Sequence, residues 1–179
     1  MTTQIEIPTL SSLEYSPYLA EDGQMSEEWQ GKIGVYAVFN GDKILQFVGY
    51  SRDISLSLKQ HLASQPQSCH WLKVQTITRP SRTILEEIKT AWIVENGSSP
   101  AGNDTDKDKW SASFDVKPYM TQEEQSAFAD SDEFAKGKLL KKVARRVEVE
   151  IKEALVARGV TMDFRFNPKL KEKGLLSLK

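Results

Sequence analysis

Two β-rich runs separated by a tight-turn sequence constrain the fold of this chain more than any other feature. The runs Ile33–Phe39 and Ile44–Tyr50 are apolar and rich in β-branched and aromatic residues, and residues 40–43 between them read Asn-Gly-Asp-Lys. Asn-Gly between two such runs is the strongest short-range signal for an antiparallel hairpin. We therefore expect residues 33–50 to form a β-hairpin.

The segments that follow the hairpin predict a compact unit of strands and helices. Ser51 or Asp53 can cap a helix that ends near Ala63, because either side chain can accept the free amide hydrogens of a helix start. Residues 71–77 alternate apolar and polar side chains, as a half-buried strand does, and an apolar helical stripe follows over 84–96. Residues 31–104 are therefore expected to form a β-β-α-β-α unit.

The flanking segments differ from this unit in charge. Residues 1–31 carry a net charge of −6 and residues 105–133 carry −5, whereas residues 134–179 carry +8, so the overall charge of −1 hides a basic C-terminal quarter. We divide the chain into an acidic N-terminal segment (1–30), a core domain (31–104), a linker with a short helix (105–131) and a basic helical C-terminal extension (132–179).

Within the last two segments, capping residues mark the expected helices. Thr121 and Glu124 have the spacing of a capping box, and Asp132 can begin a longer helix that Gly159 ends. The polar stretch 103–110 is interpreted as a loop, and Val160–Phe166 as a last β-strand before a Lys-rich tail. The extension is thus expected to be mainly helical.

Composition argues against several classes of protein. A chain of 179 residues, 39% of them hydrophobic, is long enough to bury a core without disulfides. No stretch approaches the roughly 18 apolar residues that cross a bilayer, and the first 31 residues contain no Lys or Arg, unlike secretory signals and transit peptides. The single cysteine, Cys69, fits a reducing compartment. We expect a cytoplasmic protein that does not bind membranes.

The hairpin carries two tripeptides, Gly-Val-Tyr at 34–36 and Phe-Val-Gly at 47–49, that resemble the pair naming the GIY-YIG nuclease superfamily. Further residues agree in order with that superfamily: Ser51-Arg52-Asp53, Lys59-Gln60-His61, Trp92-Ile93 and Pro100-Ala101-Gly102-Asn103. The stretch is similar in particular to the GIY-YIG domains of cyanobacterial proteins and of a plant plastid glutaredoxin. The resemblance implies an α+β fold with a small, mainly antiparallel three-stranded sheet flanked by helices.

The resemblance also implies a site for phosphodiester hydrolysis in DNA. Active members use two hairpin tyrosines, an arginine and often a histidine on the first helix, a metal-binding glutamate on the second helix, and an asparagine beyond it. On this chain the first tyrosine corresponds to Tyr36, the histidine to His61 and the asparagine to Asn103. These three residues are therefore candidate catalytic residues.

The other three positions of the resemblance carry different side chains. The second tyrosine corresponds to Phe47, the arginine to Ser57 and the glutamate to Lys89. A phenyl ring cannot ionise, a serine cannot contact phosphate bidentately, and an ammonium group repels a divalent cation. Arg52 at the helix start and Glu86, one turn before Lys89, are the candidate replacements, with Glu86 as a ligand for Mg²⁺ or Mn²⁺ if the protein is catalytic.

The basic C-terminal helix is the second candidate interface. Five bases lie within nine residues: Lys138, Lys141, Lys142, Arg145 and Arg146. Together they can make several phosphate contacts. Because the chain has no zinc-finger, homeodomain or RNP signature, we expect contacts to the nucleic-acid backbone, with DNA as the partner.

These observations leave two main hypotheses. The first is a nucleic-acid-binding GIY-YIG protein with a divergent metal-dependent DNA endonuclease activity, and the rival is a catalytically degenerate scaffold that acts as a binding or protein-interaction module. A weaker third hypothesis is a redox role for Cys69. Tyr36, His61 and Glu86 can also be ordinary core, helix-capping and surface residues, and the basic quarter can pair with the acidic segments. The sequence leaves the oligomeric state open.

Overall fold

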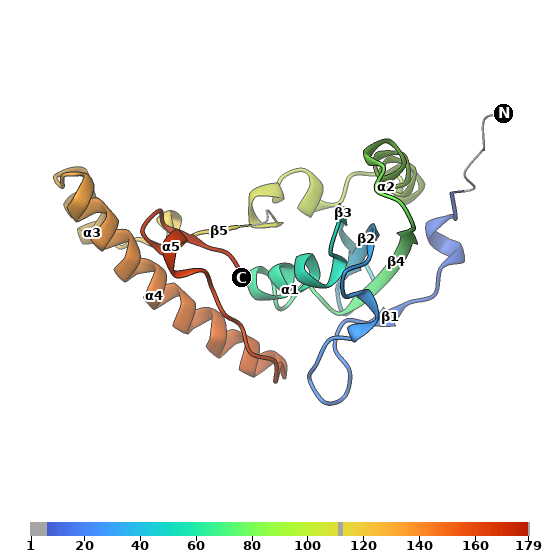
Figure 1. Ribbon diagram of the computed structural model, residues 1–179, viewed down its shortest axis with the longest axis horizontal. Helices are drawn as coiled ribbons and strands as arrows, with labels where there is room; N and C mark the ends of the chain where they lie inside the picture. Colours follow the sequence, from blue (N-terminus) through green and yellow to red (C-terminus); the bar gives the residue numbers. More distant parts are fainter. Residues whose placement is uncertain (1–6, 111–112, 179) are drawn as a thin grey trace.

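A four-stranded antiparallel sheet forms the centre of the computed structural model, which describes residues 7–110 and 113–178 (Figure 1). Its strands are β1 (Ser16–Pro17), β2 (Ile33–Phe39), β3 (Leu45–Ser51) and β4 (Trp71–Ile77), in the order β1-β4-β2-β3. The β2–β3 hairpin and the third strand are confirmed. Asn40 fixes the turn, because its Oδ1 accepts hydrogen bonds from the amides of Asp42 and Ile44, both at 3.0 Å.

Helices cover both faces of this sheet. Successive side chains of β2 point to opposite faces, so that Tyr36 and Val38 pack with α1 (Ile54–Ser64), while Val35, Ala37 and Phe39 pack with α2 (Arg82–Asn96). Both helices begin at a side-chain cap, and Asp53, which caps α1, is one of the two residues predicted for that role. The Asp53 carboxylate accepts from the Leu56 amide, and the Ser81 hydroxyl accepts from the Ile84 amide.

The long C-terminal helix α4 (Glu133–Arg158) packs against α1 on the side away from the sheet (Figure 1). Asp132 caps its start, and Gly159, with a φ of +95°, ends it as predicted. Its buried side chains share one hydrophobic cluster with those of α1: Leu140, Val143, Ala144, Val147, Ile151 and Leu155. The layers therefore follow the order α2, sheet, α1, α4.

Shorter elements join these layers. The capping box of Thr121 and Glu124 begins α3 (Gln122–Ala129), as expected. The others are the 3₁₀ helices η1 (Leu10–Ser12), η2 (Glu27–Trp29), η3 (Ala101–Asn103), η4 (Lys107–Trp110) and η5 (Lys117–Tyr119), the helix α5 (Pro168–Lys171), and the strand pair β5 (Phe114–Asp115) and β6 (Leu175–Leu176). No helix in the described part of the chain is long and apolar enough to cross a membrane.

The observed fold is the predicted α+β class, with three local differences. The sheet gains the two-residue edge strand β1, which lies in a segment without an alternating pattern. The stretch 103–110 is not an open loop: it starts at the end of η3 (Ala101–Asn103) and contains η4 (Lys107–Trp110). The last strand predicted over 160–166 is wrong: only Phe166 makes a bridge, to Leu178, because Val160, Phe164 and Phe166 alternate to pack on the core rather than to pair along a sheet.

Candidate functional site

A cavity of about 380 Å³ lies between the hairpin, α1, α2, η4 and the C-terminal segment. Its lining includes the five motif positions on the hairpin and the two helices: Tyr36, Phe47, Ser57, His61 and Lys89. The other lining residues are Gly49, Tyr50, Leu56, Gln60, Trp110, Ser177 and Leu178. The sequence-predicted residues Tyr36 and His61 are thus brought together with three positions at which this chain departs from the superfamily pattern.

Tyr36 and His61 form a buried hydrogen-bonded pair at one wall of the cavity. The Tyr36 hydroxyl lies 2.7 Å from His61 Nε2, and each residue is less than 5% exposed. Burial raises the pKa of Tyr36 well above its ordinary value and lowers the pKa of His61 to about 4. Both groups are therefore neutral near pH 7, and the contact between them is a hydrogen bond between two neutral groups.

The glycine of the second tripeptide makes room for this pair. A Cβ added at Gly49 would lie 2.5 Å from the Phe47 ring and 2.9 Å from the Tyr36 hydroxyl. Any larger residue would therefore displace the ring or the hydroxyl. His61 Nδ1 is buried and has no hydrogen-bond partner within the described residues. An unpaired buried polar atom costs free energy, about 1–3 kcal/mol, so this nitrogen is available to a ligand in the cavity.

Aromatic rings form a second wall. The Phe47 and Trp110 rings stack with centroids 5.3 Å apart and planes inclined by 10°, and both lie close to the His61 ring. The η3 turn approaches β3 so closely that a Cβ at Gly102 would lie 2.5 Å from the Gln46 carbonyl oxygen. Trp110 was not predicted as a site residue, because its contact partners are distant in sequence.

The C-terminal segment closes a third side of the cavity. The Gln60 side chain is buried and holds this segment from both ends, since its Oε1 accepts from the Leu178 amide at 3.0 Å and its Nε2 donates to the Leu176 carbonyl at 3.5 Å. Ser177 and Leu178 are therefore fixed beside α1. Sequence reasoning missed Ser177 and Leu178, because a tail of this kind carries no motif, and it noted Gln60 only as a neighbour of His61 without a role.

Asn103 affects the cavity only by hydrogen bonding to the backbone of β3. Its Oδ1 accepts from the Val48 amide at 2.8 Å, and its Nδ2 donates to the Val48 carbonyl at 2.7 Å. The asparagine thus continues the sheet edge of β3 and fixes the strand between Phe47 and Gly49. It does not line the cavity, so the structure gives it a positioning role.

The two candidate replacements lie outside the cavity lining. Arg52 is exposed and borders a separate hollow between the hairpin and the start of α2. Glu86 is exposed on α2, and its Oε1 accepts a hydrogen bond of 2.6 Å from the Tyr50 hydroxyl, which raises the pKa of Tyr50. Glu86 therefore contacts Tyr50, which lines the cavity, but does not line the cavity itself.

The donor set does not fit a divalent metal. No aspartate or glutamate is among the described residues that line the cavity, and Lys89 lies at the position where the resemblance predicts a metal-binding glutamate. Within residues 7–110 and 113–178, no group of three His, Cys, Asp or Glu side chains is placed to hold a metal ion. Mg²⁺ and Mn²⁺ prefer carboxylate oxygens, so we derive no step through a metal.

The five candidate bases of α4 differ in how exposed they are and in their contacts. Arg146 is engaged inside the fold: it binds both carboxylate oxygens of Glu124, at 2.7 and 2.8 Å, and the Tyr119 carbonyl at 2.8 Å. Lys141 is half-buried, whereas Lys138, Lys142 and Arg145 are exposed. Spacings of three and four residues place these three on one face of the helix.

Cys69 is an unsuitable redox centre. The thiol is fully buried, and burial raises its pKa well above the ordinary value. A reactive cysteine needs an accessible thiolate. The structure therefore argues against the redox hypothesis for this residue.

Comparison with known proteins identifies one relationship. No protein-family model matches the chain. The chain is similar to the bifunctional monothiol glutaredoxin-S16, chloroplastic, of Arabidopsis thaliana, with 40% identity over 74 residues. The match covers 39% of this chain and 25% of the plant protein, so the chain spans about a quarter of its relative. The predicted relationship to a plastid glutaredoxin protein is thus confirmed for part of each chain.

Proposed function

We propose that this chain is a GIY-YIG-type protein that binds nucleic acid through the phosphate backbone. The observation that carries the proposal is the convergence of residues 36, 47, 57, 61 and 89 on one cavity. These positions are spread over the hairpin and two helices, and the superfamily resemblance predicts that they share one site. The division into a core domain (31–104) and a basic extension (132–179), and a cytoplasmic location, are parts of the same proposal.

The exposed bases of α4 supply the second half of this interface. Lys138, Lys142 and Arg145 place three positive charges along one face of a helix, and each can neutralise one phosphate. Contacts of this kind give affinity without sequence readout. DNA is the proposed partner, and RNA is the alternative that the experiment separates.

The test is a binding and cleavage assay on labelled plain, nicked and branched DNA and on RNA. Each substrate is incubated with the protein in Mg²⁺, Mn²⁺ or EDTA at two salt concentrations. We expect binding that weakens steeply as salt rises, because backbone contacts release counterions. Absence of binding at low salt would contradict the proposal.

The same assay decides whether the protein cuts its substrate. Product that requires Mg²⁺ or Mn²⁺ and is lost in Tyr36→Phe would make it a divergent endonuclease. Binding without product would make it a catalytically degenerate scaffold, the function favoured by Phe47, Ser57 and Lys89 in the cavity. The Tyr36→Phe variant keeps the ring and removes only the hydroxyl bonded to His61.

A further inference from the structure

The side chains that line the cavity carry positive charge, whereas the side chains of a metal-binding site carry negative charge. Lys89 is half-buried and lines the cavity, and its Nζ lies 5.7 Å from the centroid of the Tyr50 ring. No carboxylate is among the described lining residues, and the His61 imidazole is neutral near pH 7. The side chains present therefore give the cavity a fixed positive charge, which attracts an anion and repels a cation.

The polar groups beside Lys89 suit a phosphate ester. His61 Nδ1 on α1 is buried and has no hydrogen-bond partner among the described residues. When the Tyr36 hydroxyl donates to His61 Nε2, Nδ1 carries the ring hydrogen and can donate to a phosphate oxygen. Ser57 Oγ donates its own hydrogen to the Ser51 hydroxyl at 2.7 Å and therefore offers only an acceptor. The Lys89 ammonium and the His61 ring nitrogen are thus the two donors for phosphate oxygens, and charge-assisted bonds such as that of Lys89 are the strong ones.

The size and the apolar wall of the cavity indicate which kind of phosphate ester can bind in it. At about 380 Å³ the cavity is at the lower end of the ~300–1,000 Å³ range of small-molecule sites. Leu56, Leu178 and the stacked Phe47 and Trp110 rings form its apolar side. Aromatic walls of this kind hold unpaired bases by stacking, whereas the faces of a base within a duplex are covered by its neighbours.

We propose that the cavity is a metal-independent site for one unpaired nucleotide, in which the Lys89 ammonium supplies the positive charge that a divalent metal supplies elsewhere. This inference rests on the proposed function and narrows its ligand to a single-stranded or terminal nucleotide. It predicts that mononucleotide binding is the same in EDTA and in Mg²⁺.

The experiment is calorimetric titration of the full chain with deoxynucleoside monophosphates, with the matching nucleosides, and with inorganic phosphate. Each titration is carried out in EDTA and in Mg²⁺. We expect the monophosphates to bind equally in both, and more tightly than either the nucleosides or phosphate alone. Binding that requires Mg²⁺, or no binding at millimolar monophosphate, would overturn the inference.

Three variants assign the charge to Lys89. Lys89→Gln should weaken monophosphate binding by about tenfold to a hundredfold, as expected for loss of a charge-assisted contact, and Lys89→Arg should restore most of it. Lys109→Gln removes an exposed base that does not line the cavity and should change nothing. Circular dichroism verifies that each variant is folded. Unchanged binding in folded Lys89→Gln would overturn the inference.

Oligonucleotide binding is measured in parallel to separate this inference from the proposed function. If oligonucleotides bind in a salt-dependent way but monophosphates do not, the inference fails and the proposed function stands. If monophosphates bind and oligonucleotides do not, the inference stands and the proposed function fails.

Discussion

The cavity and the basic face of α4 are both candidate contacts for nucleic acid, but they are built in opposite ways. At the cavity most polar side chains are held by buried hydrogen bonds: Tyr36 by His61 and Gln60 by the C-terminal segment, while Asn103 beside it is held by Val48. On α4 the three bases are exposed, and Lys138 lies over the Phe134 ring, also exposed, with its Nζ 4.6 Å from the ring centroid. Their effect on a nucleic acid depends mainly on charge and spacing. Side chains that are held in place can orient a ligand, whereas a row of solvated charges attracts it without orienting it. Salt weakens that attraction.

This difference decides what a substitution does in each region. A change in the cavity alters stability as well as binding, because its polar groups are buried and their partners lose a hydrogen bond. A change on the exposed face of α4 alters binding and its salt dependence, with little effect on stability. The following measurements test whether substitutions in the two regions differ in this way.

The largest expected effect is the pH dependence of stability that His61 causes. Its pKa is lowered to about 4 in the folded protein, against about 6.5 when exposed. Between these values the unfolded chain binds more protons than the folded one, so the free energy of unfolding falls as pH is lowered through this window. The contribution of His61 lost by pH 4.5 is about 2.5 kcal/mol.

Urea unfolding between about pH 7.5 and pH 4.5 measures this effect, and His61→Gln is the matched variant. The stability of His61→Gln should fall less steeply over the same interval. His70→Gln is the control, since partial burial and the nearby Arg158 also lower the pKa of His70. Identical slopes for wild type and His61→Gln would mean that His61 is accessible to protons, and the cavity would not be a fixed site.

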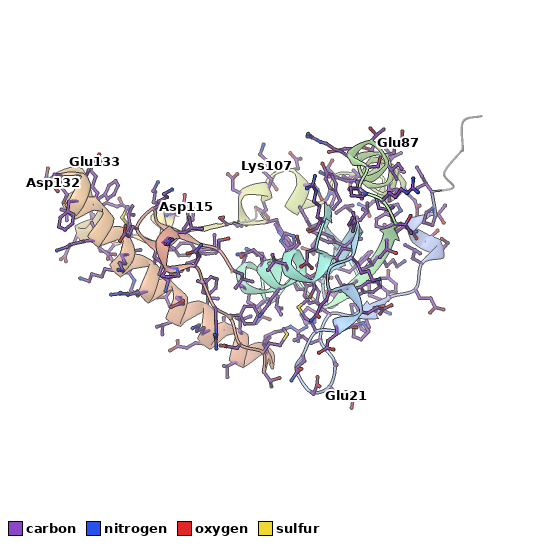
Figure 2. All side chains as sticks on the ribbon, viewed as in Figure 1. Glu21, Glu87, Lys107, Asp115, Asp132 and Glu133 are labelled. Carbon is purple, nitrogen blue, oxygen red and sulfur yellow. The ribbon has the colours of Figure 1, made fainter. Side chains whose placement is uncertain are left out.

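The second effect concerns the exposed bases of α4. Changing Lys138, Lys142 and Arg145 together to Gln should reduce DNA affinity on the order of a hundredfold near 0.1 M salt and reduce the salt slope by about 3, because three phosphate contacts are lost. Changing three exposed bases elsewhere, Lys32, Lys107 and Lys173, gives the same net charge. Figure 2 shows Lys107 on η4, apart from α4.

Fluorescence anisotropy at several salt concentrations compares the two triple variants. If both lose affinity equally, overall charge rather than the α4 face attracts DNA. The urea midpoint of the α4 variant should stay within about 0.5 kcal/mol per residue of wild type, as is usual for surface substitutions.

The two regions also differ in how far the sequence predicts them. The hairpin, the helix caps and the ends of α4 follow from local chemistry, since Asn40, Asp53 and Gly159 act on neighbours within a few residues. Tyr36 and His61 were found through a motif. Trp110 and Gln60 were not, because their roles depend on contacts with chain segments far away, and no local pattern records these contacts.

Glu86 is a residue whose contact the local sequence pattern does not predict. Glu86 has the spacing to share a face with Lys89, yet its carboxylate is bonded to the Tyr50 hydroxyl. Periodicity gives the face of a helix but not the partner that a side chain meets there. Figure 2 shows Glu87 on α2 and Asp132 and Glu133 at the opposite end of the molecule, so α2 and the start of α4 are well separated.

The third prediction tests whether Asn103 positions β3. Asn103→Ala removes both hydrogen bonds to Val48 and should lower the free energy of unfolding by about 2 kcal/mol, because the Val48 amide and carbonyl lose their partners. Asn103→Asp keeps the acceptor and loses the donor, and should lie between. Urea unfolding measures both. A direct role in binding would instead lower affinity in Asn103→Ala without changing its stability.

The smallest effect separates Arg146 from its neighbours on α4. The sequence groups it with the phosphate-binding bases, but its guanidinium binds the Glu124 carboxylate and the Tyr119 carbonyl. Arg146→Ala should therefore lower the free energy of unfolding by about 1 kcal/mol, the upper end for a partly exposed ion pair, and leave the salt slope of DNA binding nearly unchanged. Although partial burial of Glu124 raises its pKa, the Thr121 amide and Arg146 hold it below the ordinary value. The stability difference is therefore full at neutral pH and disappears as pH falls through the pKa of Glu124. If Arg146→Ala instead lowers the salt slope by about one unit and leaves the free energy of unfolding unchanged, Arg146 binds phosphate as the exposed bases do. Its contacts with Glu124 and Tyr119 would then not hold it in the fold.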